Sequence, residues 1–424
     1  MLTRLLALLL LLAAGVPAVA ADVVVVHAGR LIVDAGRPAL GPSTIIVVDG
    51  RIQSVTAGTA PAPAGARVID LPDRTILPGL IDAHVHFMSV PGAPYWRDAV
   101  DTDDYMALVG AHNALTTLRA GFTTVRDLGS PGTTGFALKR AIDEGLLPGP
   151  RMLVSGTPLS TIGGHGDVAG FRPEVMEALD GHNTCTGADQ CAARVRALAR
   201  AGADVIKFMA TGGVLSQGDR GLGQSFTDAE MRAIVETAHA LGLKVAAHAH
   251  ADEGIAAAVR AGVDSIEHGT FVSPATIQLM RQHGTTLVPT LMAFVGIRER
   301  LGHNVYTPLV ESKVRMTLEV VGRAARLAHE AGVPVVFGTD AGVYEHGRNA
   351  GEFVELVERA GLSPAQALAA ATTGAAHLLG LDNEVGRIAP GYSADLIAVE
   401  GDPLADPHVL QHVGFAMVRG HIVD

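Results

Sequence analysis

The sequence predicts an α/β protein in which a (β/α)8 TIM barrel is joined to a small β-sandwich domain built from both chain ends. The main observation is an alternation of eight apolar, strand-like runs with helical patterns through the middle of the chain, which is typical of a parallel barrel. The second is that short β-rich runs lie before and after this region. An open doubly wound sheet is the alternative, but no Gly-x-Gly-x-x-Gly motif follows the first barrel strand.

Length and composition set the outer limits. The chain has 424 residues, 48% of them hydrophobic, which suits one large domain and a small one. The net charge of −11 and the lack of a basic run argue against nucleic-acid binding. An aromatic content of 4% argues against a stacking platform for sugars or bases.

Residues 1–20 have the pattern of a secretory signal peptide. Arg4 supplies the positive charge, residues 5–16 form an apolar core, and Ala18-Val19-Ala20 is a cleavage site of the Ala-x-Ala type. A membrane anchor is the alternative, but the apolar stretch is shorter than the ~20 residues that a spanning helix needs. We therefore expect a periplasmic or secreted protein that keeps no membrane segment after cleavage.

The remaining chain divides into three segments. We expect residues 21–75 and 385–424 to form the small β-domain, with Asp49-Gly50 as a hairpin turn, and residues 76–384 to form the barrel. The barrel strands are expected at residues 76–86, 123–128, 151–155, 204–210, 244–250, 265–268, 286–291 and 333–340. Helical patterns between or after them include residues 228–241, 252–261 and 364–379.

Helix boundaries carry local signals of their own. Thr227 and Glu230 form a capping box at the start of the 228–241 helix. Several helices are expected to stop at a glycine before the next strand, namely Gly202, Gly242, Gly262 and Gly332.

Cys185 and Cys191 are the two cysteines of the chain. In a helix, six residues rise ~9 Å, which is too far for a disulfide, but Gly187 favours a loop between them. Export would permit a local disulfide, whereas two free thiols are the alternative. A zinc pair is disfavoured because no further cysteine accompanies them.

Histidines recur at the ends of the predicted strands. His84 and His86 are separated by one residue, so they face the same side of a strand and can meet at one point. The chemistry of such a barrel lies at the carboxyl ends of its strands. Four further residues occupy that position, each late in its own strand: Lys207, His248, His268 and Asp340.

Strand alternation assigns roles only in part. His248 and His250 both face the interior, so we assign His248 to a metal and His250 to substrate, and the reverse remains open. Lys207 lies in an apolar strand, where it is either paired with a carboxylate or carbamylated by CO2. Alternation turns Glu267 away from His268, so Glu267 is interpreted as structural, and Asp82 as a deeper packing residue.

Substrate contacts are expected from the loops that follow the strands. His165 lies in a glycine-rich segment after the third strand and could hold a carbonyl or carboxylate, unless that segment is only a flexible turn. Arg220 could meet a substrate carboxylate, unless it is simply exposed. Ser89 follows the histidine pair closely enough to line the pocket.

Together these residues resemble the metal-dependent amidohydrolase superfamily. The segments that carry the resemblance are residues 78–86, 206–207, 267–269 and 338–340, and residues 121–127 and 209–214 point to the imidazolonepropionase-related branch. That branch includes Xaa-Pro dipeptidases and ochratoxin-hydrolysing enzymes.

The resemblance implies a site with two divalent metal ions. His84, His86 and Asp340 would hold the first, His248 and His268 the second, and a CO2-derived carbamate on Lys207 would bridge them. Zn2+ suits the nitrogen and oxygen ligands. Asp340 would take a proton from the attacking water and pass it to the leaving nitrogen. A homo-oligomer is expected from the resemblance alone.

The predicted function is thus an exported dinuclear hydrolase that cleaves the amide bond to a C-terminal amino acid. Its substrates would be small molecules: Xaa-Pro dipeptides or N-acyl amino acids, with ochratoxin A cleaved to phenylalanine and ochratoxin alpha. A cyclic amide (imidazolone or lactam) hydrolase is the enzymatic alternative. A non-catalytic metal-binding scaffold is disfavoured because all six ligand positions are filled.

Overall fold

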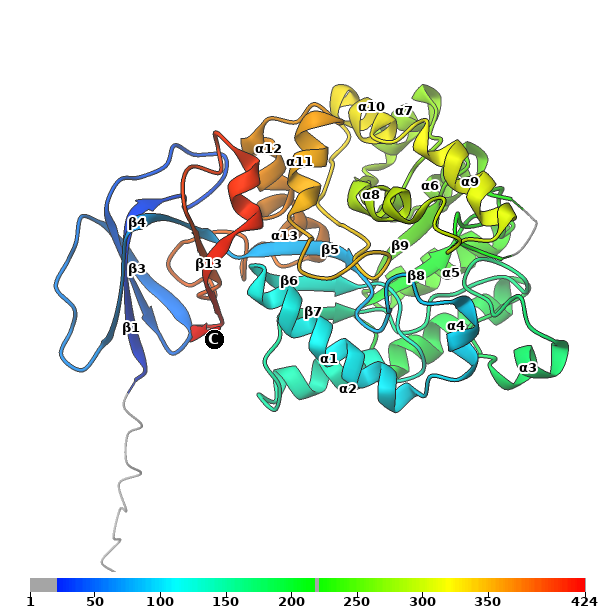
Figure 1. Ribbon diagram of the computed structural model, residues 1–424, viewed down its shortest axis with the longest axis horizontal. Helices are drawn as coiled ribbons and strands as arrows, with labels where there is room; N and C mark the ends of the chain where they lie inside the picture. Colours follow the sequence, from blue (N-terminus) through cyan, green and yellow to red (C-terminus); the bar gives the residue numbers. More distant parts are fainter. Residues whose placement is uncertain (1–20, 218–220, 424) are drawn as a thin grey trace, which may run out of the picture.

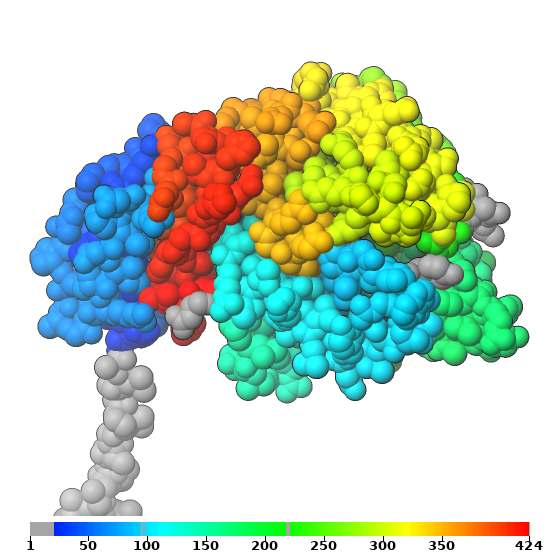
Figure 2. Space-filling view, in the orientation of Figure 1, coloured from blue at the N-terminus to red at the C-terminus, as the bar shows by residue number. Residues whose placement is uncertain are grey.

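The computed structural model describes residues 21–217 and 221–423, and both chain ends contribute to one seven-stranded sheet (Figure 1). Its order is β14-β13-β12-β4-β1-β2-β3. The strands are β1 (Val23–Leu31), β2 (Ser43–Val48), β3 (Arg51–Ala57), β4 (Arg67–Pro78), β12 (Leu396–Val399), β13 (Val413–Val418) and β14 (His421–Ile422). In Figure 2 the amino-terminal residues, in blue, lie against the carboxyl-terminal residues, in red. The β-rich part of the fold prediction is confirmed.

The β2–β3 hairpin turns at Asp49-Gly50, as predicted. Both residues have positive φ angles, 48° and 77°, which is the geometry of the two-residue turn that matches strand twist. A Cβ atom on Gly50 would lie 2.5 Å from the carbonyl oxygen of Arg419, so glycine also allows the close approach of the carboxyl-terminal segment.

The barrel is built from two parallel sheets. One has the order β5-β6-β7 and the other β11-β10-β9-β8. The strands are β5 (Leu80–Val85), β6 (Phe122–Asp127), β7 (Arg151–Val154), β8 (Val205–Met209), β9 (Lys244–Ala249), β10 (Ser265–His268) and β11 (Thr286–Val288). Compared with the prediction, the first strand is interrupted at Gly79, where the chain passes from the seven-stranded sheet into the barrel.

An extended segment at residues 333–341 closes the barrel where the eighth strand was predicted. It is too irregular to form a continuous ladder, yet it bonds to both neighbours. Val336 N donates to Leu287 O at 2.9 Å, and Asp340 N donates to His84 O at 2.7 Å. The predicted (β/α)8 architecture is confirmed.

Helices surround the barrel strands (Figure 1). Their bounds are η1 Tyr95–Ala99, α1 Asp103–Arg119, α2 Thr134–Asp143, α3 Pro173–Ala178, α4 Ala188–Ala201, α5 Asp228–Ala240, α6 Asp252–Ala261, α7 Pro274–His283, α8 Leu291–Arg300, α9 Pro308–Leu318, α10 Arg323–Ala331, α11 Gly351–Glu358, α12 Pro364–Ala370, α13 Thr373–Leu379 and η2 Pro407–Gln411. The capping box of Thr227 and Glu230 begins α5, and left-handed glycines end α4, α6 and α10.

The helix predicted at residues 364–379 is two helices, α12 and α13. The break falls where backbone N–H groups of the barrel donate hydrogen bonds to carbonyl groups at the end of α12. Ala370 O accepts a hydrogen bond from Phe337 N at 3.1 Å, and Ala371 O accepts one from Ile81 N at 2.8 Å. The helix therefore ends where its carbonyl groups bond to β5 and to the closing segment. This is a tertiary effect that the apolar pattern of the helix does not reveal.

The main apolar core lies between the barrel strands and the helices. Ala247 and Ala249 of β9 belong to it together with Ile234 of α5 and Ile255 of α6. Because neighbouring side chains alternate along a strand, His248 and His250 are left to face the barrel interior.

Cys185 and Cys191 form a disulfide, with Cα atoms 5.1 Å apart. Gly187, at a φ of 83°, precedes the first residue of α4, so the segment between the cysteines is not helical throughout. This resolves the alternative that the sequence left open. Over the described part of the chain, no helix is both long and apolar enough to cross a bilayer.

Candidate metal centre

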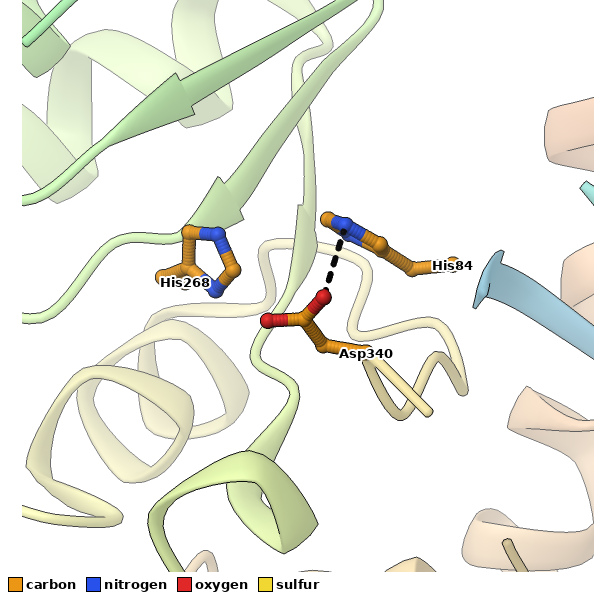
Figure 3. A group of neighbouring side chains, drawn as sticks. All are labelled: His84, His268 and Asp340. Carbon is orange, nitrogen blue, oxygen red and sulfur yellow. Dashed lines mark ion pairs between the residues drawn. The ribbon is translucent and has the colours of Figure 1, made fainter. Parts of the chain in front are cut away.

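Three side chains from separate barrel elements converge at the carboxyl ends of the strands. His84 lies in β5, His268 ends β10, and Asp340 lies in the closing segment (Figure 3). One potential ligand atom from each lies within 4.8 Å of the others. His268 and Asp340 have φ angles of 70° and 58°, the left-handed region that residues other than glycine rarely adopt. Such backbone strain is concentrated at functional sites in proteins.

His84, His86 and Asp340 form a compact triangle of ligand atoms. The Nε2 atoms of the two histidines are 3.3 Å apart. Asp340 Oδ1 lies 3.5 Å from His84 Nε2 and 3.3 Å from His86 Nε2. Ligands of a tetrahedral zinc ion at ~2.0–2.1 Å are about 3.3 Å from one another. The triangle thus has the dimensions of one face of such a site.

The remaining histidines surround this triangle. The His248 ring lies 4.7 Å from that of His268 and 4.6 Å from that of His250, between centroids. His248 Nε2 is 3.4 Å from Gly212 O, and His250 Nδ1 is 2.8 Å from Thr270 Oγ1. Both histidines are therefore close enough to take part, and the choice between them as ligand stays a prediction.

Burial keeps most of these histidines uncharged. Desolvation, with the nearby Lys207 ammonium, lowers the pKa of His84 to about 4. Desolvation and neighbouring histidines lower the pKa values of His248 and His268 well below the usual range. Neutral imidazole is the form that binds metals. At His86, by contrast, Asp340 outweighs burial and raises the pKa, so the triangle favours a positive charge at its centre.

Glu267 holds His84 in the orientation that a ligand needs. His84 Nδ1 donates to Glu267 Oε2 at 2.7 Å, so its Nε2 lone pair faces the triangle. Arg126 donates to the other carboxylate oxygen at 2.9 Å. Burial alone would raise the pKa of Glu267, but Arg126 and His84 lower it to about 2.

The sequence interpretation of Glu267 as merely structural missed this contact. Strand alternation alone would turn Glu267 away from His268, but His268 has a left-handed φ of 70° and its ring lies 5.3 Å from that of His84, between centroids. Glu267 itself faces the interior, where it meets His84 of β5. The available signal was a glutamate inside an apolar strand, which needs a buried partner.

Backbone and hydroxyl groups hold the other rings. His86 Nδ1 donates to Gly129 O at 3.2 Å, and His268 Nδ1 is 2.6 Å from Thr290 Oγ1. Asp82 lies deeper, as predicted, and accepts hydrogen bonds from His84 N at 3.1 Å and from Thr339 Oγ1 at 2.6 Å. It thereby ties the strand of His84 to the segment of Asp340.

Lys207 projects from β8 toward the triangle, with Nζ 3.5 Å from His84 Nε2. Only 1% of the residue is exposed, and within the described chain its ammonium forms no ion pair. Desolvation lowers the pKa of Lys207 to about 8. The charged form of Lys207 is thus destabilised by desolvation, and it lies beside histidine and carboxylate atoms that could bind a metal ion.

The predicted substrate contacts are not all placed together. His165 lines a cavity of about 860 Å³ formed by the loops after β7 and β8 and the start of α1. Its ring lies 4.4 Å from the His248 ring, which links the cavity to the metal centre. Ser89 lines a different hollow, beside Leu108 and His112 of α1. Arg220 lies outside the described residues.

Comparison with known proteins identifies the class to which this barrel and site belong. Residues 75–423 match the Amidohydrolase family, and the chain belongs to that family. The protein is a hydrolase of a metal-dependent family that acts on amide bonds.

Individual relatives support the predicted branch. A solved structure of a Xaa-Pro dipeptidase with methionine in its active site is 35% identical, has a TM-score of 0.86, and covers 95% of this chain and 99% of its own. Ochratoxinase from Aspergillus niger is 32% identical over 79% of this chain and 72% of its own. Imidazolonepropionase from Symbiobacterium thermophilum is 26% identical over 88% of both chains. The predicted superfamily and branch are confirmed.

Proposed function

We propose that this protein is an exported, dinuclear amidohydrolase that cleaves the amide bond to a C-terminal amino acid. The observation that carries the proposal is the triangle of His84, His86 and Asp340, with His268 and Lys207 beside it. Three ligand atoms at mutual distances of 3.3–3.5 Å suit one cation.

The residues fit the ions that the family requires. His84, His86 and Asp340 would hold one ion and His248 and His268 the other, with Zn2+ favoured by the nitrogen and oxygen donors. The ions would supply Lewis acidity at the scissile carbonyl and lower the pKa of the attacking water. Glu267 and Gly129 fix the rings of His84 and His86 before any ion arrives.

Lys207 would join the two halves of the site as a carbamate. The neutral amine attacks CO2, so an N–C bond forms and the nitrogen loses a proton to water. The product is an anion, which replaces a buried cation next to His84. That exchange removes the cost of the buried ammonium and adds carboxylate oxygens as ligands.

Asp340 is the group that would move the proton. Burial would raise its pKa, but His84 and His86 lower it, so the carboxylate is ionised at neutral pH. In this state it can accept a proton from the attacking water at a carboxylate oxygen and donate it to the leaving nitrogen.

The relatives support the proposed substrate class. A Xaa-Pro dipeptidase is 35% identical to the chain, and an ochratoxinase is 32% identical. The solved structure of the dipeptidase has methionine bound in its active site. A free amino acid as product is common to dipeptide and N-acyl amino acid hydrolysis. The cavity beside His165 would receive the part of the substrate on one side of the amide.

Export is supported by two independent features. The pattern of residues 1–20, which lie outside the described part, is that of a signal peptide. The Cys185–Cys191 disulfide suits an oxidising compartment. Expression of the full chain in a bacterium, followed by fractionation, tests this: the mature protein should start near Ala21 and leave the cytoplasm. A homo-oligomer is also proposed and is tested by light scattering.

The activity test is a substrate panel for the mature, zinc-loaded protein, read by mass spectrometry. It contains Xaa-Pro dipeptides, N-acyl amino acids, ochratoxin A and cyclic amides. Release of a C-terminal amino acid, lost on chelation and restored by zinc, is expected. Opening of the cyclic amides alone would instead assign the protein to imidazolonepropionase-like chemistry.

Two substitutions test the site itself. Asp340→Ala and His248→Ala should each abolish turnover while circular dichroism shows an intact fold. Substantial turnover in either variant would contradict the assigned roles. Carbamylation of Lys207 is tested by mass spectrometry under native conditions, which should show a mass gain of one CO2 that Lys207→Ala lacks.

A further inference from the structure

Lys313 is a buried cation that the proposed chemistry does not use. It lies on α9, in the region after the seventh barrel strand, and is 5% exposed. Its Nζ donates to Gly213 O at 2.9 Å and to Ser216 O at 2.7 Å. Within the described chain it forms no ion pair, and desolvation lowers its pKa. A buried cation held only by backbone carbonyls needs a reason beyond stability.

The two carbonyl groups belong to a turn that lines the cavity. Ser216 N donates to Gly213 O at 3.4 Å, so the carbonyls of both residues converge on the lysine. Gly212, Ser216 and Gln217 line the cavity beside His165. Lys313 therefore acts from α9 on the wall of that cavity.

The same turn holds His165. Ser216 Oγ is 2.6 Å from His165 Nδ1. A Cβ atom on Gly213 would lie 2.3 Å from the ring of His165, so the ring rests directly against the Gly213 backbone. The ring also neighbours that of His248, at 4.4 Å between centroids. His165 thus contacts both residues whose carbonyl groups accept hydrogen bonds from Lys313, namely Gly213 and Ser216.

A second contact and an apolar cluster join α9 to this segment. Thr307, the N-cap of α9, donates to Gln217 Oε1 at 3.2 Å. Val214 packs in a small apolar cluster with Val310 and Val314, on either side of Lys313. The cluster packs α9 against this segment, and the two hydrogen bonds from Lys313 fix the direction of the Gly213 and Ser216 carbonyl groups.

We propose that Lys313 is a positioning residue that sets the shape of the substrate cavity and the place of His165 beside the metal centre. The inference rests on the proposed function, because it takes the cavity as the substrate site. Lys313 is not itself among the cavity-lining residues and is not one of the proposed metal ligands, so its hydrogen bonds act on the cavity through the carbonyl groups of Gly213 and Ser216.

The test compares Lys313→Met with Lys244→Met as a matched control. Lys244 Nζ also donates to two carbonyls, His377 O at 3.2 Å and Leu378 O at 2.7 Å, but it lies at the start of β9, at the other end of the barrel. Hydrogen–deuterium exchange is measured on the zinc-loaded variants. Lys313→Met should raise exchange in the peptides covering residues 211–217 and 163–168, whereas Lys244→Met should not.

Kinetics on an Xaa-Pro dipeptide supply the second readout. Lys313→Met should raise KM by about tenfold or more, with a smaller change in kcat, because buried hydrogen bonds to a charged group are lost. Lys313→Arg should restore most of the affinity, and Lys313→Met should have little added effect in a Ser216→Ala background. Metal content should stay that of the wild type.

Three results would overturn the inference. They are unchanged exchange in residues 211–217 of folded Lys313→Met, raised exchange with unaltered KM, or equal effects in Lys244→Met. If wild type cleaves no member of the panel, the proposed function fails, while the exchange experiment still decides whether Lys313 holds the turn. If Lys313→Met does not fold, Lys313→Arg and Ser216→Ala carry the comparison.

Discussion

Glu267 decides which nitrogen of His84 faces the metal centre. Replacement by glutamine keeps an acceptor for His84 Nδ1 but removes the charge that balances Arg126. We expect Glu267→Gln to lower metal affinity and kcat/KM by about 10–100-fold, the usual effect of losing a residue that orients a ligand. Metal titration and steady-state kinetics measure both.

An exposed glutamate provides the comparison for that substitution. Glu236→Gln, on the outer face of α5, should leave both quantities unchanged. Wild-type metal affinity in Glu267→Gln would show that the hydrogen bond to His84 does not govern the site.

Glu352 should make stability depend on pH. Its carboxylate accepts hydrogen bonds from Leu291 N at 2.9 Å and Met292 N at 2.6 Å, at the start of α8. Burial outweighs these bonds and raises the pKa of Glu352 well above its usual range. The folded protein thus holds this proton more tightly than the unfolded chain does, and stability falls as pH rises above the ordinary glutamate pKa.

Glu352→Gln removes this dependence. The Tm of the variant relative to wild type should rise as the pH increases above about 5, because only the wild type must then release its proton or bury a charge. Thermal unfolding at several pH values measures it, with exposed Glu358→Gln as the control on the same helix. A constant difference in Tm across the range would contradict the shift.

At the scale of elements, the disulfide should stabilise the entry to α4. It closes a short loop, so its loss should lower the free energy of unfolding by about 2 kcal/mol. Replacing both Cys185 and Cys191 with serine and measuring chemical unfolding tests this. Reducing agent should lower the stability of wild type by a similar amount and leave the variant unaffected.

Elements were predictable where a local signal determined them. The capping box at Thr227, the Asp49-Gly50 hairpin and the left-handed glycines at helix ends depend on a few neighbouring residues. The break between α12 and α13 was not predictable, since it depends on hydrogen bonds from Phe337 and Ile81, distant in the sequence.

The candidate site shows the same division. Strand alternation was enough to bring His84 and His86 to one point, because His84 lies at the end of β5 and His86 follows directly after it. It could not foresee Glu267 beside His84 or Lys313 behind His165, since those contacts join elements far apart in the chain. Loop residues were the least predictable. Ser89, which was expected to line the substrate pocket, instead lies in a separate hollow.

At the scale of the whole molecule, the two chain ends depend on each other. β12 pairs with β4, and Leu396 and Met417 share an apolar core with Val26 and Ile45. Deleting residues 385–424 should expose that core and the edge of β4, giving aggregated protein. Deleting only residues 420–424 removes the two-residue edge strand β14 and should leave the protein soluble. Soluble yield and light scattering distinguish the two, and a soluble, monodisperse long deletion would contradict the expectation.

The position of β4 also sets an order of folding. Its partner on one side, β1, is made early, but its partner on the other, β12, is among the last strands synthesised. The barrel strands all lie between β4 and β12 in the chain, so the barrel can fold while one edge of β4 is still unpaired. We therefore expect completion of the seven-stranded sheet to be the final event of folding. Until the carboxyl-terminal segment has been made, β4 of the nascent chain has an unpaired edge that is prone to aggregation and that a chaperone would have to shield.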